Sequence, residues 1–183
     1  MTEGATFTQM TGISLWHLRG PDAVATATAA GIRLDPDWFR HVAITGGGLA
    51  AQLGAREVFV LDTRSAEASW SRALQDAADH GTWIFPRQDH IFALEGPGWR
   101  ELLLAVCAYE FEQSRGGDFV MTYMAGAGCW FALPHINGDP VIVGCDPSYS
   151  RYLKSTIADV LANRSLDVST AKSFETKGEA HDA

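Results

Sequence analysis

The sequence lacks the features that mark metal-binding, disulfide-rich and membrane proteins. Its 183 residues include three cysteines, Cys107, Cys129 and Cys145, with no CxxC pair and no clustered histidine spacing, so neither a zinc site nor a disulfide framework is predicted. No apolar run approaches the length that spans a bilayer, and the first residues have neither the basic start nor the apolar stretch of a signal peptide. We expect buried thiols, no membrane partner and a cytoplasmic location.

Positive charge is also scarce. The chain has 14 lysines and arginines against 22 aspartates and glutamates, which gives a formal net charge of −8. Binding to a nucleic-acid backbone depends on clustered Lys and Arg side chains that release counterions from the phosphates. We therefore expect no nucleic-acid partner.

Nucleotide-binding and nucleophile motifs are missing as well. Gly46-Gly47-Gly48 is followed by a strand-like segment, whereas the GxGxxG and GxxxxGK[ST] fingerprints require a following helix. No GxSxG occurs, and the Cys and His residues show no recognisable local signature of a nucleophile and its base. The triple glycine is interpreted as a turn.

Isolated acid–base candidates remain. Asp89 beside His90 is compatible with an oriented general base, although a turn carboxylate next to a partly exposed imidazole is the simpler interpretation. The other candidates are interpreted as structural or solvated: His17 in an apolar strand, Glu110 and Glu112 on diverging faces, and His135 at a strand end. We assign no catalytic, cofactor-binding or metal-binding residue.

What the sequence does contain is an internal repeat. Leu18-Arg19-Gly20-Pro21 is echoed in the second half of the chain by Leu94-Glu95-Gly96-Pro97, each at the end of an apolar run and before a helical stretch. Asp62 and Asp146, separated by a similar offset, each follow a valine-rich run and precede a helical pattern. Both pairs indicate a strand, a cap and a helix, so two copies predict one pseudo-symmetric domain.

The pattern of apolar residues and turn signals predicts the elements and the domain boundaries. Helices are expected over residues 23–30, 65–80, 97–107 and 148–162, with Ser65 as a hydroxyl cap, and strands over 13–19, 42–45, 55–62, 82–85, 90–95, 119–124, 129–133 and 141–145. We expect an N-terminal extension over residues 1–12, a domain over 13–163 with halves of about 13–81 and 82–163, and a polar tail over 164–183.

The sequence is rich in tryptophan but offers few candidate acid–base residues. The six tryptophans are Trp16, Trp38, Trp70, Trp83, Trp99 and Trp130. Core filling and burial against a partner both remain open, because tryptophan serves both purposes. Residues 34–40, a connector with Trp38 and Phe39, are expected to tuck these rings against the body.

The order of these segments resembles a known family. The runs Leu18-Arg19-Gly20-Pro21-Asp22-Ala23, Ala55-Arg56-Glu57-Val58-Phe59-Val60-Leu61 and Phe92-Ala93-Leu94-Glu95-Gly96-Pro97, each leading into a helix, resemble the folate-binding aminomethyltransferase-like domain. More narrowly, they look like the gamma subunit of heterotetrameric sarcosine oxidase and the small subunit of N-methylglutamate dehydrogenase. The resemblance covers about residues 13–161 and implies an α+β fold of duplicated ferredoxin-like halves with mainly antiparallel sheet. Phe85-Pro86-Arg87-Gln88-Asp89 stands where many members carry an Asp-Val-Ser-like segment, so no catalytic residue is carried over.

The resemblance also implies a function. It suggests a non-catalytic accessory subunit of a heteromeric flavoprotein complex that oxidatively demethylates sarcosine or N-methylglutamate, with one-carbon transfer to tetrahydrofolate. The partners would be larger flavin- and folate-binding subunits carrying FAD, FMN, NAD and tetrahydrofolate. Two alternatives stay open: a stand-alone folate-binding protein or one-carbon transferase that uses Asp89, His90 or Glu95, and a homo-oligomer that buries its tryptophans against copies of itself.

Overall fold

Two antiparallel five-stranded sheets form the body of the protein. The computed structural model describes residues 4–63, 70–78 and 81–164. The first sheet has the order β3 (Arg40–Ala43), β4 (Gly48–Gly54), β5 (Glu57–Asp62), β2 (Ser14–Arg19) and β6 (Trp83–Arg87). The second sheet has the order β1 (Thr6–Met10), β7 (His90–Glu95), β10 (Val141–Cys145), β9 (Ala127–Ala132) and β8 (Phe119–Met124). The expected α+β class with antiparallel sheet is confirmed.

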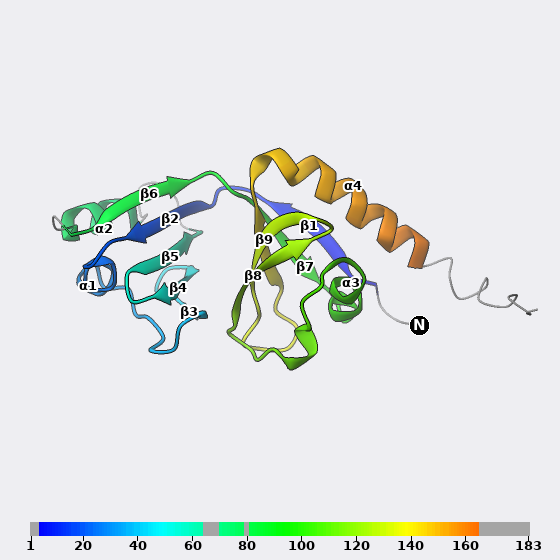
Figure 1. Ribbon diagram of the computed structural model, residues 1–183, viewed down its shortest axis with the longest axis horizontal. Coiled ribbons are helices and arrows are strands. Elements are labelled where there is room, and N and C mark those ends of the chain that lie inside the picture. Colours follow the sequence, from blue (N-terminus) through cyan, green and yellow to red (C-terminus); the bar gives the residue numbers. More distant parts are fainter. Residues whose placement is uncertain (1–3, 64–69, 79–80, 165–183) are drawn as a thin grey trace, which may run out of the picture.

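Two helices accompany each sheet. They are α1 (Ala23–Ala29) and α2 (Trp70–Ala77) on the first sheet, and α3 (Trp99–Val106) and α4 (Pro147–Arg164) on the second. A short 3-10 helix, η2 (Phe111–Gln113), follows α3. Figure 1 shows the resulting two lobes, with α1 and α2 at one end and α3 and α4 at the other.

The predicted repeat is visible in the strand order. The strands β2, β3, β4 and β5 occupy the same relative places in the first sheet as β7, β8, β9 and β10 do in the second. In both halves the helix starts at the same distance from its Gly-Pro pair, at Ala23 and at Trp99. α1 begins at Ala23, as predicted, and α3 begins at Trp99, two residues later than predicted.

The fifth strand of each sheet comes from the other half. β1 precedes β2 in the chain but pairs with β7, whereas β6 precedes β7 but pairs with β2. The segments 6–19 and 83–95 therefore run antiparallel across both lobes (Figure 1). The expected extension over residues 1–12 differs from the structure, because Thr6–Met10 is part of the second sheet. The expected boundary between the halves at 81/82 also differs, because β6 belongs to the first sheet. Strand pairing is a long-range choice that periodicity does not encode.

Glycine is required at both Gly-Pro turns because the chain approaches another backbone there. Gly20 and Gly96 have φ values of +126° and +94°, which side-chain-bearing residues rarely adopt. A Cβ at Gly20 would lie 2.1 Å from the carbonyl oxygen of Gly81, and one at Gly96 would lie 2.4 Å from that of Gly4. The repeated motif thus marks two equivalent close contacts.

One aspartate at the end of β5 and one directly after β10 accept hydrogen bonds from amides of α2 and α4. Asp62 Oδ2 accepts a hydrogen bond from the Trp70 amide (2.7 Å) at the start of α2. Asp146 Oδ1 accepts from the Ser148 amide (2.9 Å) in the first turn of α4. Ser65, the predicted cap of the earlier helix, lies outside the described residues.

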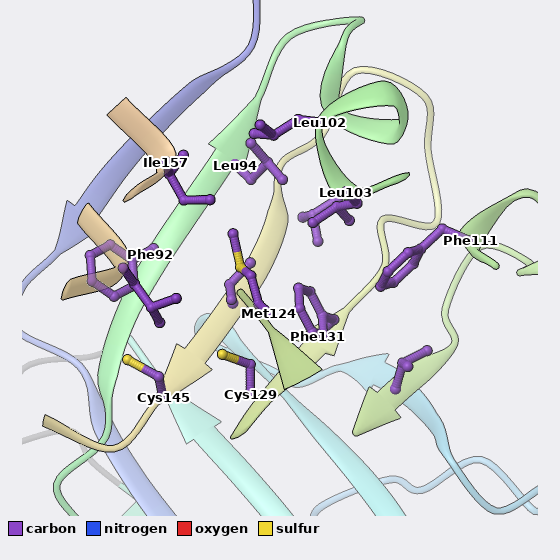
Figure 2. Close-up of a cluster of buried hydrophobic side chains, with 14 of the residues drawn as sticks. Phe92, Leu94, Leu102, Leu103, Phe111, Met124, Cys129, Phe131, Cys145 and Ile157 are labelled. Atoms are coloured by element: carbon purple, nitrogen blue, oxygen red, sulfur yellow. The ribbon is translucent and has the colours of Figure 1, made fainter. Parts of the chain in front are cut away.

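The core has three parts. One lies between the first sheet and its helices, and a second lies between the second sheet and its helices, where Phe92, Leu103, Phe131 and Ile157 are fully buried (Figure 2). The third part lies between the two sheets and joins the lobes. Its members, all buried, are Leu15, Leu49, Ala51, Leu53, Phe59, Leu61, Ile91, Phe119, Trp130 and Ala132.

A polar seam also joins the halves beside β3. The His41 amide donates to the Gly117 carbonyl (2.8 Å), and the Phe119 amide donates to the Phe39 carbonyl (2.7 Å). Arg40 Nη1 donates to Asp118 Oδ1 at 2.6 Å. The edge of the first sheet is therefore tied to the segment that leads into β8.

Residues 34–40 differ from the prediction. Trp38 and Phe39 are exposed instead of tucked against the body. Phe39 has a φ of +57°, and its amide donates to the Gln52 carbonyl (2.8 Å) while its carbonyl accepts from Phe119. These backbone bonds hold an unfavourable conformation and leave the neighbouring Trp38 ring in solvent.

Candidate partner-binding surface

The structure separates the acid–base pair considered from sequence. Asp89 accepts hydrogen bonds from Arg87 Nε (3.1 Å) and Nη2 (3.0 Å) and from Trp130 Nε1 (2.8 Å). His90 Nδ1 instead lies 3.4 Å from Gln9 Nε2. The Asp89 carboxylate thus orients an indole and a guanidinium, and Glu95 lies about 17 Å from His90, at the other end of β7, by strand geometry.

The remaining histidines have structural contacts. His17 Nε2 donates to Glu57 Oε1 at 2.7 Å, and burial lowers the pKa of His17 below its usual 6.5 despite this carboxylate. His135 Nε2 donates to the His41 carbonyl at 2.9 Å. Glu110 and Glu112 are exposed around the 3-10 helix. None of these pairs brings a base next to a nucleophile.

All three cysteines are free thiols, with Cys129 and Cys145 buried and directly opposite each other in β9 and β10. Burial raises the pKa of Cys107 and Cys129 to about 12 and that of Cys145 to about 11. A thiolate is the reactive form of cysteine, so these groups are unreactive at neutral pH.

No group of three or more His, Cys, Asp or Glu side chains in the described part of the chain is arranged to hold a metal ion. None of the helices within residues 4–63, 70–78 and 81–164 has the length and apolar character that a membrane crossing requires. The triple glycine forms the turn between β3 and β4, as predicted.

A shallow groove of about 700 Å³ lies on the first sheet. Alternate residues of β2, β5 and β6 share one face of this sheet, and the inner part of that face is covered by the second sheet. The outer part extends beyond this cover. It carries Trp83 and Phe85, whose exposed fractions are 57% and 49%.

Trp38 lines the same groove from the opposite side and is 58% exposed. Together, Trp38, Trp83 and Phe85 form what we term the aromatic groove. β6 is also the edge strand of its sheet, so the two rings it carries stand at a sheet border. Soluble proteins rarely expose contiguous aromatic side chains unless the surface meets a partner.

Charged side chains border the aromatic groove. Arg19 and Arg56 line it with Glu57, and Arg19 Nη2 lies 3.7 Å from Glu57 Oε2. Glu57 is shared with His17, as described above. The rim therefore has more positive than negative groups, in contrast to the chain as a whole, and suits an apolar partner segment that carries carboxylates.

A second cavity of about 370 Å³ opens where the two sheets meet. It is lined by Arg87, Asp89, Met121, Tyr123, Trp130 and Gly144, among others. The Trp130 indole is 3% exposed and lies over Gly144, where a Cβ would come within 2.1 Å of the ring. The volume suits a small ligand, but the Asp89 carboxylate is already bonded to its two neighbours.

The tryptophans therefore divide between the two roles left open by the sequence. Trp130 is buried, and Trp38 and Trp83 are exposed in the aromatic groove. The role of Arg19 and Arg56 at the rim was not predicted from the sequence. A sequence signal for the groove was the alternation in Trp83-Ile84-Phe85, which places two rings on one face of a strand.

Solved structures of other proteins share this fold, and two of them illustrate the likeness. A chain of the heterotetrameric sarcosine oxidase from Corynebacterium sp. U-96, in complex with pyrrole 2-carboxylate, matches with a TM-score of 0.74 and 16% identity over 89% of this chain and 86% of that chain. The glycine cleavage system aminomethyltransferase T from Bartonella henselae matches with a TM-score of 0.66 and 13% identity over 84% of this chain.

The two matches differ in how much of the other protein they cover. The sarcosine oxidase chain is similar in length to this one, whereas this chain spans 45% of the aminomethyltransferase. No protein family and no curated protein matches the sequence itself. At such identities the likeness establishes the fold, and the expected aminomethyltransferase-like architecture is confirmed at that level.

Proposed function

We propose that this chain is a non-catalytic, gamma-type accessory subunit of a heteromeric flavoprotein complex. The complex would oxidatively demethylate an N-methyl amino acid, sarcosine or N-methylglutamate, and pass the one-carbon unit to tetrahydrofolate. The observation that carries the proposal is the match over nearly the full length of both chains with one chain of a heterotetrameric sarcosine oxidase.

The surface of the chain supports an accessory role. The aromatic groove offers two exposed tryptophans and a phenylalanine beside two arginines, which are the residue types enriched where partners dock. The candidate acid–base groups, in contrast, are engaged in structural hydrogen bonds. This chain would contribute packing and assembly.

The cofactors are assigned to the partners. We infer that larger flavin- and folate-binding subunits carry FAD, FMN, NAD and tetrahydrofolate, and that flavins supply the oxidation of the N-methyl group. The thiols with raised pKa and the paired Asp89 are poorly suited to that chemistry. Its own residues would act by holding a larger subunit at the aromatic groove.

Affinity purification from the native host tests the proposal. The tagged wild-type chain should co-purify with larger chains, identified by mass spectrometry, and the eluate should show a flavin absorption spectrum. Trp83→Ala should reduce the recovered flavin at least tenfold, because truncation of an interface tryptophan commonly costs about 2 kcal/mol of binding free energy.

Tyr149→Ala is the matched control, since Tyr149 is an exposed aromatic residue on α4, away from the groove. It should leave the recovery of flavin unchanged. A colourless eluate that contains only the tagged chain would refute the accessory role.

The runner-up is a stand-alone folate-binding protein. The cavity of about 370 Å³ between the sheets favours it, because Asp89 and Trp130 both line that cavity. Addition of tetrahydrofolate to the isolated chain would then quench tryptophan fluorescence with saturation. The accessory-subunit proposal expects no saturable quenching by the isolated chain.

A further inference from the structure

A small polar cavity lies on the second lobe, apart from the aromatic groove. Its volume is about 120 Å³, and it is lined by the first turn of α3, the loop before β8 and the loop between β9 and β10. The polar lining residues are Arg100, Arg115, His135 and Asn137. Three chain segments thus bring nitrogen-bearing side chains to one place.

The lining is cationic, in a chain of net charge −8. Its positive charge comes from two arginines, and no aspartate or glutamate is among the described residues that line it. Asp118 lies in the adjacent loop, but its carboxylate accepts from Arg40 Nη1 (2.6 Å) and from the Arg115 amide (2.7 Å). Among the described residues, no carboxylate therefore lines the cavity to offset its positive charge.

Arg100 is held in place before any ligand arrives. Its guanidinium carbon lies 4.3 Å from the centre of the Trp99 ring, and Nη1 donates to the Phe111 carbonyl at 2.7 Å. No hydrogen bond within the described residues uses its Nη2 or Nε. A guanidinium that is already oriented loses little conformational entropy when it binds an oxyanion.

Arg115 and His135 also line the cavity. The Arg115 backbone is fixed by bonds with Asp118, while its guanidinium has no hydrogen-bond or ion-pair partner within residues 4–63, 70–78 and 81–164. His135 donates through Nε2 to the His41 carbonyl, which leaves Nδ1 as its other polar atom. Both side chains are exposed, so a solute can reach the cavity.

We propose that this cavity binds a single small oxyanion, either a phosphate group or a carboxylate group. Arginine forks match both groups geometrically, and the printed contacts of Arg100 and Arg115 leave guanidinium donors available for such a group. A volume of about 120 Å³ corresponds to about four water molecules, which suits one tetrahedral or planar oxyanion and excludes a nucleotide. The inference does not depend on the proposed function.

Isothermal titration calorimetry tests the site, with inorganic phosphate in one arm and acetate in the other. Sodium chloride keeps the ionic strength constant, because screening alone changes weak binding. At least one of the two anions should bind saturably with a stoichiometry near one. Arg115→Gln should weaken this binding about tenfold, the usual effect of losing one charge-assisted hydrogen bond.

Arg151→Gln is the matched control, because Arg151 is an exposed arginine on α4 and its substitution removes the same charge. It should change the affinity less than about twofold, since exposed charges at a distance are largely screened. Thermal unfolding of both variants checks that each is folded. The proposal is overturned if neither anion binds saturably, or if both variants weaken binding equally, which would indicate general charge attraction.

Discussion

Replacement of Asp89 is the most informative perturbation of this fold. The Asp89 side chain is 6% exposed and connects the segment between β6 and β7 to Trp130 on β9. In sequence it lies beside a histidine and looks like part of an acid–base pair. In the structure its oxygens satisfy the Trp130 indole and the Arg87 guanidinium, so we expect its loss to affect stability.

The magnitude follows from what Asp89→Ala leaves behind. The Trp130 N–H would be buried without an acceptor, which costs about 1–3 kcal/mol. The Arg87 side chain is 34% exposed and can be hydrated, so loss of that pair adds at most about 1 kcal/mol. We expect a decrease of about 2–3 kcal/mol in the free energy of unfolding. Asp89→Asn keeps an acceptor oxygen and should cost about 1 kcal/mol.

Urea denaturation followed by circular dichroism measures these changes in the free energy of unfolding. For a chain of this size, the change expected for Asp89→Ala corresponds to a decrease in Tm of about 4–12 °C. Asp159→Ala, at an exposed position of α4, is the control and should change stability by less than about 0.5 kcal/mol. In a Trp130→Phe background no indole N–H remains, so Asp89→Ala should cost distinctly less. An equal cost in both backgrounds would refute the assigned hydrogen bond.

Two further predictions concern the same lobe junction. Gly144→Ala places a Cβ 2.1 Å from the Trp130 ring and should lower the free energy of unfolding by about 1–3 kcal/mol, whereas Gly128→Ala, whose Cβ would meet only the Tyr123 ring at 4.0 Å, should be nearly neutral in the same urea titration. His41 Nε2 donates to the Leu133 carbonyl (2.7 Å), and burial lowers the pKa of His41 in the folded state below 6.5. As the pH drops below 6.5, this histidine is therefore protonated more readily in the unfolded chain than in the folded one, and the free energy of unfolding should fall. His41→Gln should flatten this dependence in denaturation curves recorded above and below pH 6.5; an unchanged slope would contradict the argument.

The local chemistry of the chain predicted most of the elements. Apolar runs and turn signals located eight of the ten strands in the described residues, β3 with a shift of two residues, and the Gly-Pro pairs located the starts of α1 and α3 to within two residues. These signals work because the side-chain period and the conformational freedom of glycine are properties of a short segment. The strands β1 and β4 were missed, since Thr6–Met10 lies outside the repeat and Gly48–Gly54 begins and ends with glycine and contains no β-branched residue.

The candidate surface was less predictable. From the sequence, each tryptophan could have been buried in the core or exposed to a partner. Alternation along a strand shows which side chains share a face of the sheet, but it does not show how far the opposite sheet covers that face. Trp130 and Trp83 both lie on strand faces, yet one is 3% and the other 57% exposed. The cationic cavity is likewise assembled from α3 and two loops that are distant in sequence.

The sequence alone determined the duplicated plan of this protein: strand, glycine turn and helix, written once in each half of the chain. Only the tertiary structure decided that the two halves exchange their leading strands, β1 and β6, and that Asp89 bonds to the distant indole of Trp130. The physical reason is that turns and helix starts depend on neighbouring residues. Sheet partners, buried hydrogen bonds and surface exposure depend on which distant segments remove one another from water.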